Sequence, residues 1–316
     1  MTSIERMVEL PEEVTDEVPA VPEADGGLRP RLSDDGRGVM NTALRELDAR
    51  HRDGRPLRVG IIGLGSFGRM ALTQLGRIPG VRVVAIADGD RRTATEAVRC
   101  AQVENPGLIT DEVDILLETE PDVVVEATGR PIAGGAHAVA ASEHGCHVVM
   151  ANSAADALAG PELARRARAA GRGYTLARGD RPALICDLVT WARVNGFGVV
   201  AAGRESLHRS GHHQRNPDTV WELFDHSQEQ IRGRGYTVRA VTSLVDGTQV
   251  AMELASVANA CGLVPQARGL VHPPCGADRH AELLVPRSGG GLQGHSGTGE
   301  AVSALRRDGH PDTNDL

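Results

Sequence analysis

The sequence predicts an α/β protein with a doubly wound parallel sheet and a second, α/β or α+β domain for substrate binding and oligomerisation. Three observations predict this class. Residues 57–63, LRVGIIG, form an apolar run of strand length that stops at glycines. Apolar runs and helix-spaced segments then alternate as far as residue 152. Residues 121–129, PDVVVEATG, have the continuous apolar centre of a strand that is buried on both faces.

The first half of the chain contains five strand signals separated by helical patterns. A helix precedes them between Asn41 and Gly54, because apolar residues recur there at helical spacing. Right-handed crossovers should connect the strands. Strands are expected over residues 57–63, 81–88, around 109, 121–129 and 146–152, and helices over 66–78, 94–101, 113–120 and 133–145.

The second half keeps this alternation with different motifs. Residues 216–224, NPDTVWELF, begin a helix with Asn216 or Asp218 as its cap and Pro217 in its first turn. Residues 236–263 are predicted to hold a strand, an Asp-Gly turn and a long helix. The remaining elements are expected to be a helix over 158–171, a strand over 173–177, a helix over 182–196 and a strand over 197–203.

Composition divides the chain into four parts. Residues 1–40 are rich in Glu, Asp, Pro and Gly and show no sustained period, so a disordered acidic extension is expected. Residues 41–155 hold the first domain and residues 156–286 the second. Residues 287–316 have the Gly- and Ser-rich, polar composition of a flexible tail.

Charge and composition exclude several functions. The net charge of −8 argues against a nucleic-acid partner, because a phosphate-binding surface needs concentrated positive charge. The sequence contains no signal peptide and no apolar run of membrane-spanning length, so a cytoplasmic protein without a membrane partner is expected. The five scattered cysteines, without a CxxC pair, indicate reduced thiols. All 34 basic residues are arginine, and arginine can clamp an anion but hardly act as a base.

Gly63, Gly65 and Gly68 have the GxGxxG spacing of the dinucleotide-binding fingerprint, between a predicted strand and a predicted helix. The first glycine makes the tight turn, the second lets the backbone approach a pyrophosphate, and the third allows close packing. The phosphates would lie at the helix N-terminus, beside the amides of Ser66 and Phe67. Residues 41–155 are therefore predicted to be a dinucleotide-binding domain of the Rossmann type.

Asp88 ends the second predicted strand, 20 residues past Gly68, where an acidic side chain accepts hydrogen bonds from the adenosine ribose. Its charge would repel a 2′-phosphate, which favours NAD as the cofactor. Arg91 and Arg92 follow closely and could pair with such a phosphate, so NADP remains the alternative. Both arginines also fit a solvated first turn of a helix.

Two further loops are expected to close over the nicotinamide half of the cofactor, since ligands of such sheets lie beyond the carboxyl ends of the strands. Thr128 and Asn152 are the polar side chains in these loops that can contact the ribose or the carboxamide. Each could instead cap the helix that follows it.

Several motifs resemble those of the homoserine dehydrogenase-like NAD(P)-binding oxidoreductases. The resemblance covers residues 41–286 and is carried by VGIIGLGSFG, DVVVEATG, HVVMANSAADALAGP, GDRPALICDLVTWARVNGFGVVAAG, NPDTVW and SLVDGTQVAMELASVANACGL. The most similar group is the bacterial branch that usually carries a C-terminal SAF-type domain, which we do not expect in this chain. The resemblance implies a Rossmann domain, NAD(P), and oxidation or reduction of a small polar substrate.

The chain departs from this family at residues with catalytic potential. Arg204 and Gln249 stand where members of this group commonly have lysine, and Ser153 stands where true homoserine dehydrogenases have one. Lysine can polarise a carbonyl and exchange a proton, whereas arginine can only polarise it. Arg204 is therefore expected to orient the substrate oxygen or carboxylate, and acid/base chemistry must come from another residue.

His213 is the candidate acid/base, because similar proteins also show histidine there and imidazoles titrate near neutral pH. A solvated surface cluster with His208 and His212 is the alternative. No metal is expected, since no carboxylate or cysteine at ligand spacing accompanies these histidines. Asp246 fits a turn, and Glu253 faces substrate or solvent from its helix.

The sequence therefore predicts an NAD(P)-dependent oxidoreductase that transfers a hydride to or from a small hydroxylated or carbonyl metabolite. The alternative is a degenerate member that binds the dinucleotide without turnover, as a sensor or partner subunit. A homo-oligomer is expected, because the chain ends before the further strands of its relatives and leaves a sheet edge to be covered.

Overall fold

The computed structural model describes residues 42–101, 103, 107–206, 211–223, 229, 237–267, 269–275 and 279–303. The predicted extension over residues 1–40, His208, and the end of the predicted tail lie outside the described residues. No described helix is long and apolar enough to cross a membrane.

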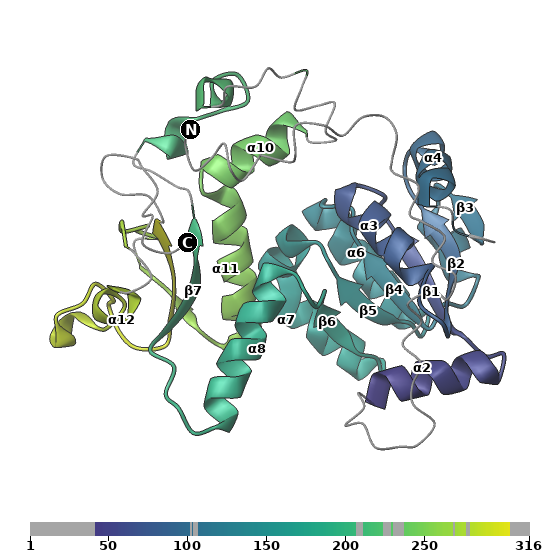
Figure 1. Ribbon diagram of the computed structural model, residues 1–316, viewed down its shortest axis with the longest axis horizontal. Helices are drawn as coiled ribbons and strands as arrows, with labels where there is room; N and C mark the ends of the chain where they lie inside the picture. Colours follow the sequence, from purple (N-terminus) through teal and green to yellow (C-terminus); the bar gives the residue numbers. More distant parts are fainter. Residues whose placement is uncertain are drawn as a thin grey trace, which may run out of the picture.

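The first domain is a parallel sheet of six strands in the order β3-β2-β1-β4-β5-β6, with helices between the strands (Figure 1). This order, which extends in both directions from β1, confirms the predicted doubly wound Rossmann-type sheet. Its elements are α2 (Thr42–Arg52), β1 (Leu57–Ile62), α3 (Ser66–Leu75), β2 (Val81–Ala87), α4 (Arg91–Ala101), β3 (Leu108–Thr110), α5 (Val113–Leu117), β4 (Val123–Glu126), α6 (Pro131–Glu143), β5 (His147–Met150), α7 (Ser153–Ala169) and β6 (Tyr174–Leu176).

Two apolar layers cover this sheet, one on each face. Leu72 of α3 and Ala94 of α4 pack against Ile61 and Ile86 on one face. On the other face α5, α6 and α7 pack against residues such as Val124. Both layers consist mainly of Ala, Val, Ile and Leu, as the near absence of aromatic residues requires.

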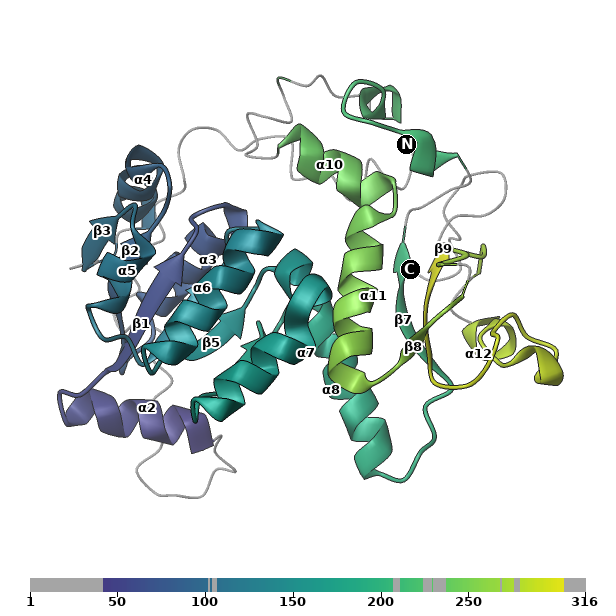
Figure 2. The same ribbon diagram turned by 180° about the vertical axis from the view of Figure 1, so that it is seen from behind.

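The second domain is built on a smaller parallel sheet in the order β7-β9-β8. Helices α7, α8 and α11 lie between the two sheets in both views (Figures 1 and 2). Ile185 of α8 and Leu254 of α11 pack with Ala301 of β9 in one core. The elements are α8 (Arg181–Val194), β7 (Ala201–Ser206), η1 (His212–Gln214), η2 (Val220–Leu223), α10 (Val238–Val245), α11 (Thr248–Cys261), β8 (Val264–Pro265), α12 (His280–Leu283), η4 (Arg287–Gly289) and β9 (Thr298–Ser303).

The two sheets extend across two of the predicted domain boundaries. Strand β6 pairs with β5 and so extends the first sheet beyond residue 155, because its three residues continue the parallel register. Residues 298–303 are not part of a flexible tail but form β9, the buried centre of the second sheet. Their small and polar side chains resemble a loose segment in composition, yet the pairing with β7 and β8 buries all of them.

Three predicted elements differ in type or position. The strand expected at the start of residues 236–263 is the helix α10, whose buried Val241 and Val245 lie one helical turn apart and whose Thr237 caps it. The strand expected over 197–203 begins later, at Ala201. The helix expected over 216–224 is described as one 3₁₀ turn, which Asn216 Oδ1 caps by accepting from Asp218 N and Thr219 N.

Candidate functional site

Close backbone contacts hold two of the three glycines in the loop between β1 and α3. Gly63 has a φ of +92°, and a Cβ there would lie 2.7 Å from Thr128 N. A Cβ on Gly68 would lie 2.0 Å from Gly63 O. Both positions therefore require glycine for the fold itself, the first for a left-handed turn and the second for the packing of α3.

Gly65 lacks any such constraint. It is exposed, precedes α3 as its N-cap with φ −65° and ψ −169°, and no atom lies within 4 Å of a Cβ built on it. Any residue can adopt these dihedral angles. The protein alone therefore gives no reason for glycine at this position, whereas a pyrophosphate lying against the backbone does.

Ser66 and Phe67 form the first turn of α3, directly after Gly65. Ser66 is exposed, and the Phe67 ring packs against the core of the sheet. N–H groups in the first turn have no acceptor within the helix and carry its positive end. The predicted anion-binding amides are thus at an open helix N-terminus.

Asp88 follows β2 and contacts the glycine loop. Its Oδ2 accepts from Leu64 N at 2.6 Å, and its Oδ1 accepts from Asp90 N at 2.9 Å. The carboxylate therefore lies beside the loop, as the spacing predicts. Arg91 is exposed and donates to Ile109 O at 3.3 Å, and Arg92 is also exposed on the first turn of α4.

Glu126, the last residue of β4, places a fully buried carboxylate at the carboxyl edge of the sheet. Its Oε1 accepts from Thr128 Oγ1 at 2.5 Å, and His137 Nδ1 lies 3.3 Å from the same oxygen. Its Oε2 has no hydrogen-bond partner among the described residues. Thr128 is therefore held by Glu126 rather than free to contact a ligand with its hydroxyl proton.

Asn152 is buried and joins the two predicted loops. Its Oδ1 caps α7 by accepting from Ala155 N at 3.2 Å, and its Nδ2 donates to Arg130 O at 3.1 Å and lies 3.5 Å from Thr128 Oγ1. Thr128 and Asn152 thus lie together, as expected for loops at one edge of the sheet. The helix-capping role that the sequence left open for Asn152 is the one observed.

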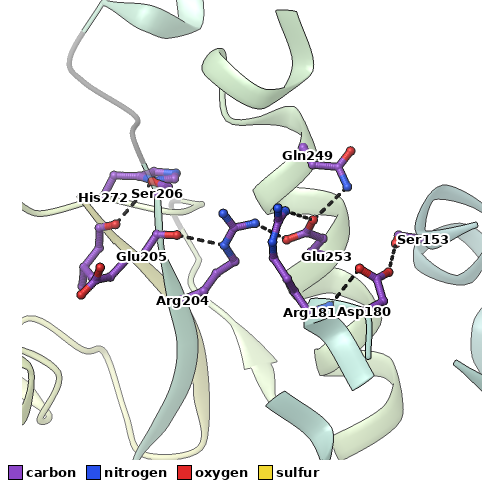
Figure 3. Close-up of polar contacts among 10 residues, drawn as sticks. Ser153, Asp180, Arg181, Arg204, Glu205, Ser206, Gln249, Glu253 and His272 are labelled. Carbon is purple, nitrogen blue, oxygen red and sulfur yellow. Dashed lines mark hydrogen bonds and ion pairs between the residues drawn. The ribbon is translucent and has the colours of Figure 1, made fainter. Parts of the chain in front are cut away.

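A second polar group surrounds the buried carboxylate of Glu253 on α11 (Figure 3). Glu253 Oε2 accepts from Arg204 Nη1 at 2.5 Å, and Oε1 accepts from Arg181 Nη1 at 3.0 Å and Gln249 Nε2 at 2.9 Å. We call these four residues the Glu253 cluster. Two guanidinium groups against one carboxylate leave the cluster with a net positive charge.

The Arg204 guanidinium has one nitrogen, Nη2, that is available to bind a ligand. Its Nη1 is paired with Glu253, its Nε donates to Glu205 O at 2.9 Å, and no described residue bonds to its Nη2. Its side chain is 19% exposed. Because two bonds fix the guanidinium and part of it stays accessible, Arg204 can bind a carbonyl oxygen or a carboxylate.

The Glu253 cluster is connected to the first domain at the carboxyl end of β5. Asp180 Oδ1 accepts from Arg181 N at 2.9 Å, and its Oδ2 lies 3.5 Å from Ser153 Oγ (Figure 3). Ser256 of α11 donates to Ser153 O at 3.2 Å. Positions 153, 204 and 249, where the resemblance to the family implies lysine, are therefore brought into one connected network.

The other predicted candidates lie outside this network. His213 is exposed on the short turn η1, and the hydrogen bonds of Arg204 and Glu253 do not include it. Asp246 Oδ1 accepts from Thr248 N at 2.8 Å, which is the turn role that the sequence indicated. Among the described residues, no group of three His, Cys, Asp or Glu side chains could hold a metal ion.

Sequence reasoning did not select Arg181, Asp180 or Glu126. Arg181 and Asp180 belong to the motif GDRPAL. Its acidic N-cap and its Arg-Pro pair mark the start of a helix, and the arginine in that first turn was the available signal. Glu126 is the last residue of an apolar strand, and Asp88 directly follows another. This shared position at the carboxyl end of a strand was the signal that could have identified Glu126.

Two family models match the chain, one over each domain. Residues 63–177 match the homoserine dehydrogenase NAD-binding domain, and residues 179–310 match the catalytic domain of oxidoreductase DRL. The boundary between the two matches falls after β6, where the first sheet ends. No curated protein matches the chain.

Solved structures with a similar fold include three dehydrogenases. A homoserine dehydrogenase from Thiobacillus denitrificans is 22% identical with a TM-score of 0.48, over 66% of this chain and 50% of that one. The WlbA dehydrogenase from Bordetella pertussis, in complex with NADH and UDP-GlcNAcA, is 18% identical with a TM-score of 0.39, over 49% and 48%. A myo-inositol dehydrogenase from Lactobacillus casei, in complex with NAD(H) and myo-inositol, is 18% identical with a TM-score of 0.37, over 52% and 50%. The chain thus spans about half the length of these proteins.

Proposed function

We propose that the protein is a homoserine dehydrogenase-like NAD-binding oxidoreductase that transfers a hydride to or from a small polar metabolite. Two matches support this, one of residues 63–177 to the homoserine dehydrogenase NAD-binding domain and one of residues 179–310 to the catalytic domain of oxidoreductase DRL. The substrate carries a hydroxyl or carbonyl group at the reacting carbon. The nicotinamide cofactor supplies or accepts the hydride, and the residues of this chain bind and orient the two reactants.

Gly65 is the observation that carries this proposal. The fold explains glycine at positions 63 and 68 by clashes of 2.7 and 2.0 Å, but leaves open space at position 65. A dinucleotide pyrophosphate that approaches the loop backbone accounts for glycine there. The first-turn amides of Ser66 and Phe67 then donate to the phosphates.

We assign NAD rather than NADP as the cofactor because of Asp88. Its carboxylate is held against the glycine loop by Leu64 N, so a negative charge lies where the adenosine ribose is expected. Of the two cations that could offset a 2′-phosphate, Arg91 donates to Ile109 O, and Arg92 lies exposed on the first turn of α4.

On the substrate side, Arg204 orients the oxygen or carboxylate of the substrate through its open Nη2 edge. Glu253 positions Arg204, and Arg181 and Gln249 hold Glu253 in turn. We assign the proton transfer to His213, which must then approach the substrate from the exposed turn η1. Thr128 and Asn152 shape the nicotinamide end of the cofactor site.

The test is calorimetric titration of NADH and NADPH into the wild-type protein, Gly65→Ala and a control, Gly198→Ala. Gly198 is an exposed glycine of the second domain, also with no atom within 4 Å of an added Cβ. We expect wild type and Gly198→Ala to bind NADH more tightly than NADPH. Gly65→Ala should bind at least ~100-fold more weakly, a loss of about 2.7 kcal/mol, with an unchanged melting temperature.

Absence of binding by the wild-type protein would contradict the proposal. Binding should be followed by cofactor turnover with a panel of polyols, aldehydes and amino-acid semialdehydes. Tight binding with no turnover would instead support a member that has lost catalysis, and the double variant Arg204→Lys with Gln249→Lys should then create activity.

We also propose that the protein forms a homo-oligomer through the outward face of α8. Leu184, Leu188 and Trp191 lie on this face at helical spacing and are 48%, 66% and 61% exposed. The Phe197 ring stacks on Trp191 with centroids 6.0 Å apart. A single helical stripe of this kind pairs with its own copy about a two-fold axis. Leu188→Asp should convert the oligomer to a monomer in light scattering, and a wild-type monomer would contradict the proposal.

A further inference from the structure

Two cysteines from different helices meet beside the core of the second domain. Cys186 lies in α8, and Cys261 is the last residue of α11. Both are free and half-buried, and their thiol groups lie close enough for each to affect the pKa of the other. Both also pack against the same apolar cluster. The fold therefore brings together two sulfur atoms that are 75 positions apart in the sequence.

We propose that Cys186 and Cys261 form a reversible disulfide in response to a hydroperoxide, and that they are a redox-modification site between α8 and α11. The proposal does not depend on the oxidoreductase function, because it concerns thiols outside the Glu253 cluster and the glycine loop.

The surroundings make the two thiols unequal. The neighbouring Cys186 thiol and the nearby Arg193 guanidinium lower the pKa of Cys261 to about 7. The Cys261 thiol, burial, and the negative charges of Asp156 and Asp187 raise the pKa of Cys186. Arg193 is fixed near Cys261, since its Nη1 donates to Cys261 O at 2.6 Å. Cys261 is therefore the attacking thiolate, and Cys186 is the resolving thiol.

The chemistry proceeds in two balanced steps. The Cys261 thiolate attacks the peroxide, so an S–O bond forms, the O–O bond breaks, and the first water or alcohol leaves after protonation. The Cys186 sulfur then attacks the Cys261 sulfur, so the S–S bond forms, the S–O bond breaks, and water leaves with the proton of Cys186. The two thiols together lose two electrons and two protons, and the hydroperoxide gains them.

A small oxidant can reach the pair, because Cys186 and Cys261 are both partly exposed. Cys186 lines a cavity of about 510 Å³ between α7, β6, α8 and α11, together with Asn259 and Ala260, the neighbours of Cys261 in sequence. The remaining cysteines differ in position. Cys146 and Cys275 are buried, and Cys100 is exposed on α4 of the first domain, where it donates to Glu96.

A disulfide at this place would tie the two helices that carry the Glu253 cluster. Cys186 follows Arg181 by five residues on α8, and Cys261 follows Glu253 by eight on α11. Because the bond closes a loop of 75 residues in the unfolded chain, oxidation should also stabilise the protein.

The test treats the purified full-length protein with a slight excess of hydrogen peroxide, blocks the remaining thiols, and maps the peptides by mass spectrometry without reduction. We expect a Cys186–Cys261 linked peptide, a loss of about two hydrogens in the intact mass, and full reversal by dithiothreitol. The midpoint of thermal unfolding should rise by several degrees on oxidation.

The variants separate this pair from general thiol oxidation. Cys100→Ser, which removes the exposed thiol, should keep both the linked peptide and the thermal shift, whereas Cys186→Ser and Cys261→Ser should lose both. A wild-type protein that links Cys100 instead, or that oxidises Cys261 to a sulfinic acid without forming the bond, would overturn the proposal. The wild-type peptide map decides the question even where a serine variant folds poorly.

Discussion

The glycine loop and the Glu253 cluster hold the two halves of the proposed reaction, yet they are built in opposite ways. The loop is made by backbone atoms of a few neighbouring residues, from Gly63 to Gly68. The Glu253 cluster is made by side chains of α8, β7 and α11, with partners 72 and 49 residues apart. The position of a site made by neighbouring backbone atoms can therefore be predicted from the spacing of residues in the sequence. A site made by distant side chains depends on tertiary packing, which this spacing does not encode.

The largest effect should come from breaking the loop at a glycine that the fold needs. Gly68→Ala places a Cβ 2.0 Å from Gly63 O, a backbone atom that cannot move without shifting β1 or α3. We expect a loss of about 4 kcal/mol in the free energy of unfolding, measured by urea titration. Gly65→Ala should change it by about 0.5 kcal/mol or less.

This pair of substitutions separates structure from ligand binding within a single motif. Gly68→Ala should lose stability and cofactor binding together, while Gly65→Ala should lose binding alone. Equal losses of stability in both variants would mean that Gly65 also has a packing role. The open space around Gly65 would then no longer indicate a bound pyrophosphate.

A smaller effect is expected from the Glu253 cluster, where Glu253→Gln removes the charge and keeps the shape. The half-buried Arg204 guanidinium then loses its ionic partner. We expect this loss to lower the free energy of unfolding by about 3 kcal/mol, the lower end of the range for a buried ion pair, because Arg181 is 46% exposed. Urea unfolding at neutral pH measures this loss. Substrate KM should rise while NADH affinity stays unchanged, since the glycine loop is not touched.

Glu162 offers a matched control, because it too is paired with two arginines, Arg165 and Arg166, but at the surface. These hydrogen bonds lower the pKa of Glu162 to about 2. The contribution of Glu162 to the free energy of unfolding is therefore present at pH values above the ordinary glutamate pKa. It is lost as the pH falls toward about 2. Glu162→Gln should leave stability at neutral pH almost unchanged. A similar loss in both variants would show that burial does not distinguish the two clusters.

The elements that sequence reasoning predicted correctly are those with a local signal. Gly63, Gly65, Gly68 and Asp88 lie at the predicted turn, helix start and strand end, because these features are set by neighbouring residues. Their role in cofactor binding stays a prediction. Strands β1, β2, β4 and β5 of the first sheet were found for the same reason, since each contains a continuous apolar run.

The elements that it predicted wrongly, or missed, depend on distant partners. Strand β9 consists of small and polar residues, and only its position between β7 and β8 buries them. Arg181 gains its role from Glu253, 72 residues away, and the sequence around it shows only a helix start. Thr128 and Asn152 lie together as the sequence predicts, but the sequence did not point to the Glu126 carboxylate that holds Thr128 in place.

The smallest effect should come from Asp156 of α7, which lies where the two domains meet. Asn259 of α11 donates to Asp156 O at 3.0 Å, and Tyr174 OH donates to Asp156 Oδ1 at 2.8 Å. Burial raises the pKa of Asp156, while the Tyr174 and Ser256 hydroxyls partly oppose this. Because the folded pKa exceeds the unfolded one, the folded state binds the proton more tightly. The contribution of Asp156 is thus fully present below the ordinary aspartate range and is lost as the pH rises through the folded pKa.

Asp156→Asn should therefore remove a pH dependence of stability of the order of 1 kcal/mol. The measurement is the difference in unfolding free energy between wild type and variant, followed from about pH 2 to about pH 7 so that it covers the pKa ranges of both Asp156 and the control. Asp90→Asn is the control of opposite sign, because the exposed Asp90 accepts from Thr93 and Arg92 N, and these bonds lower its pKa. As the pH falls, the unfolding free energy of the wild type should rise relative to that of Asp156→Asn. It should fall relative to that of Asp90→Asn. If both free energy differences changed with pH in the same direction, the Asp156 carboxylate would be solvated. The interface between the first and second domains would then be open to water.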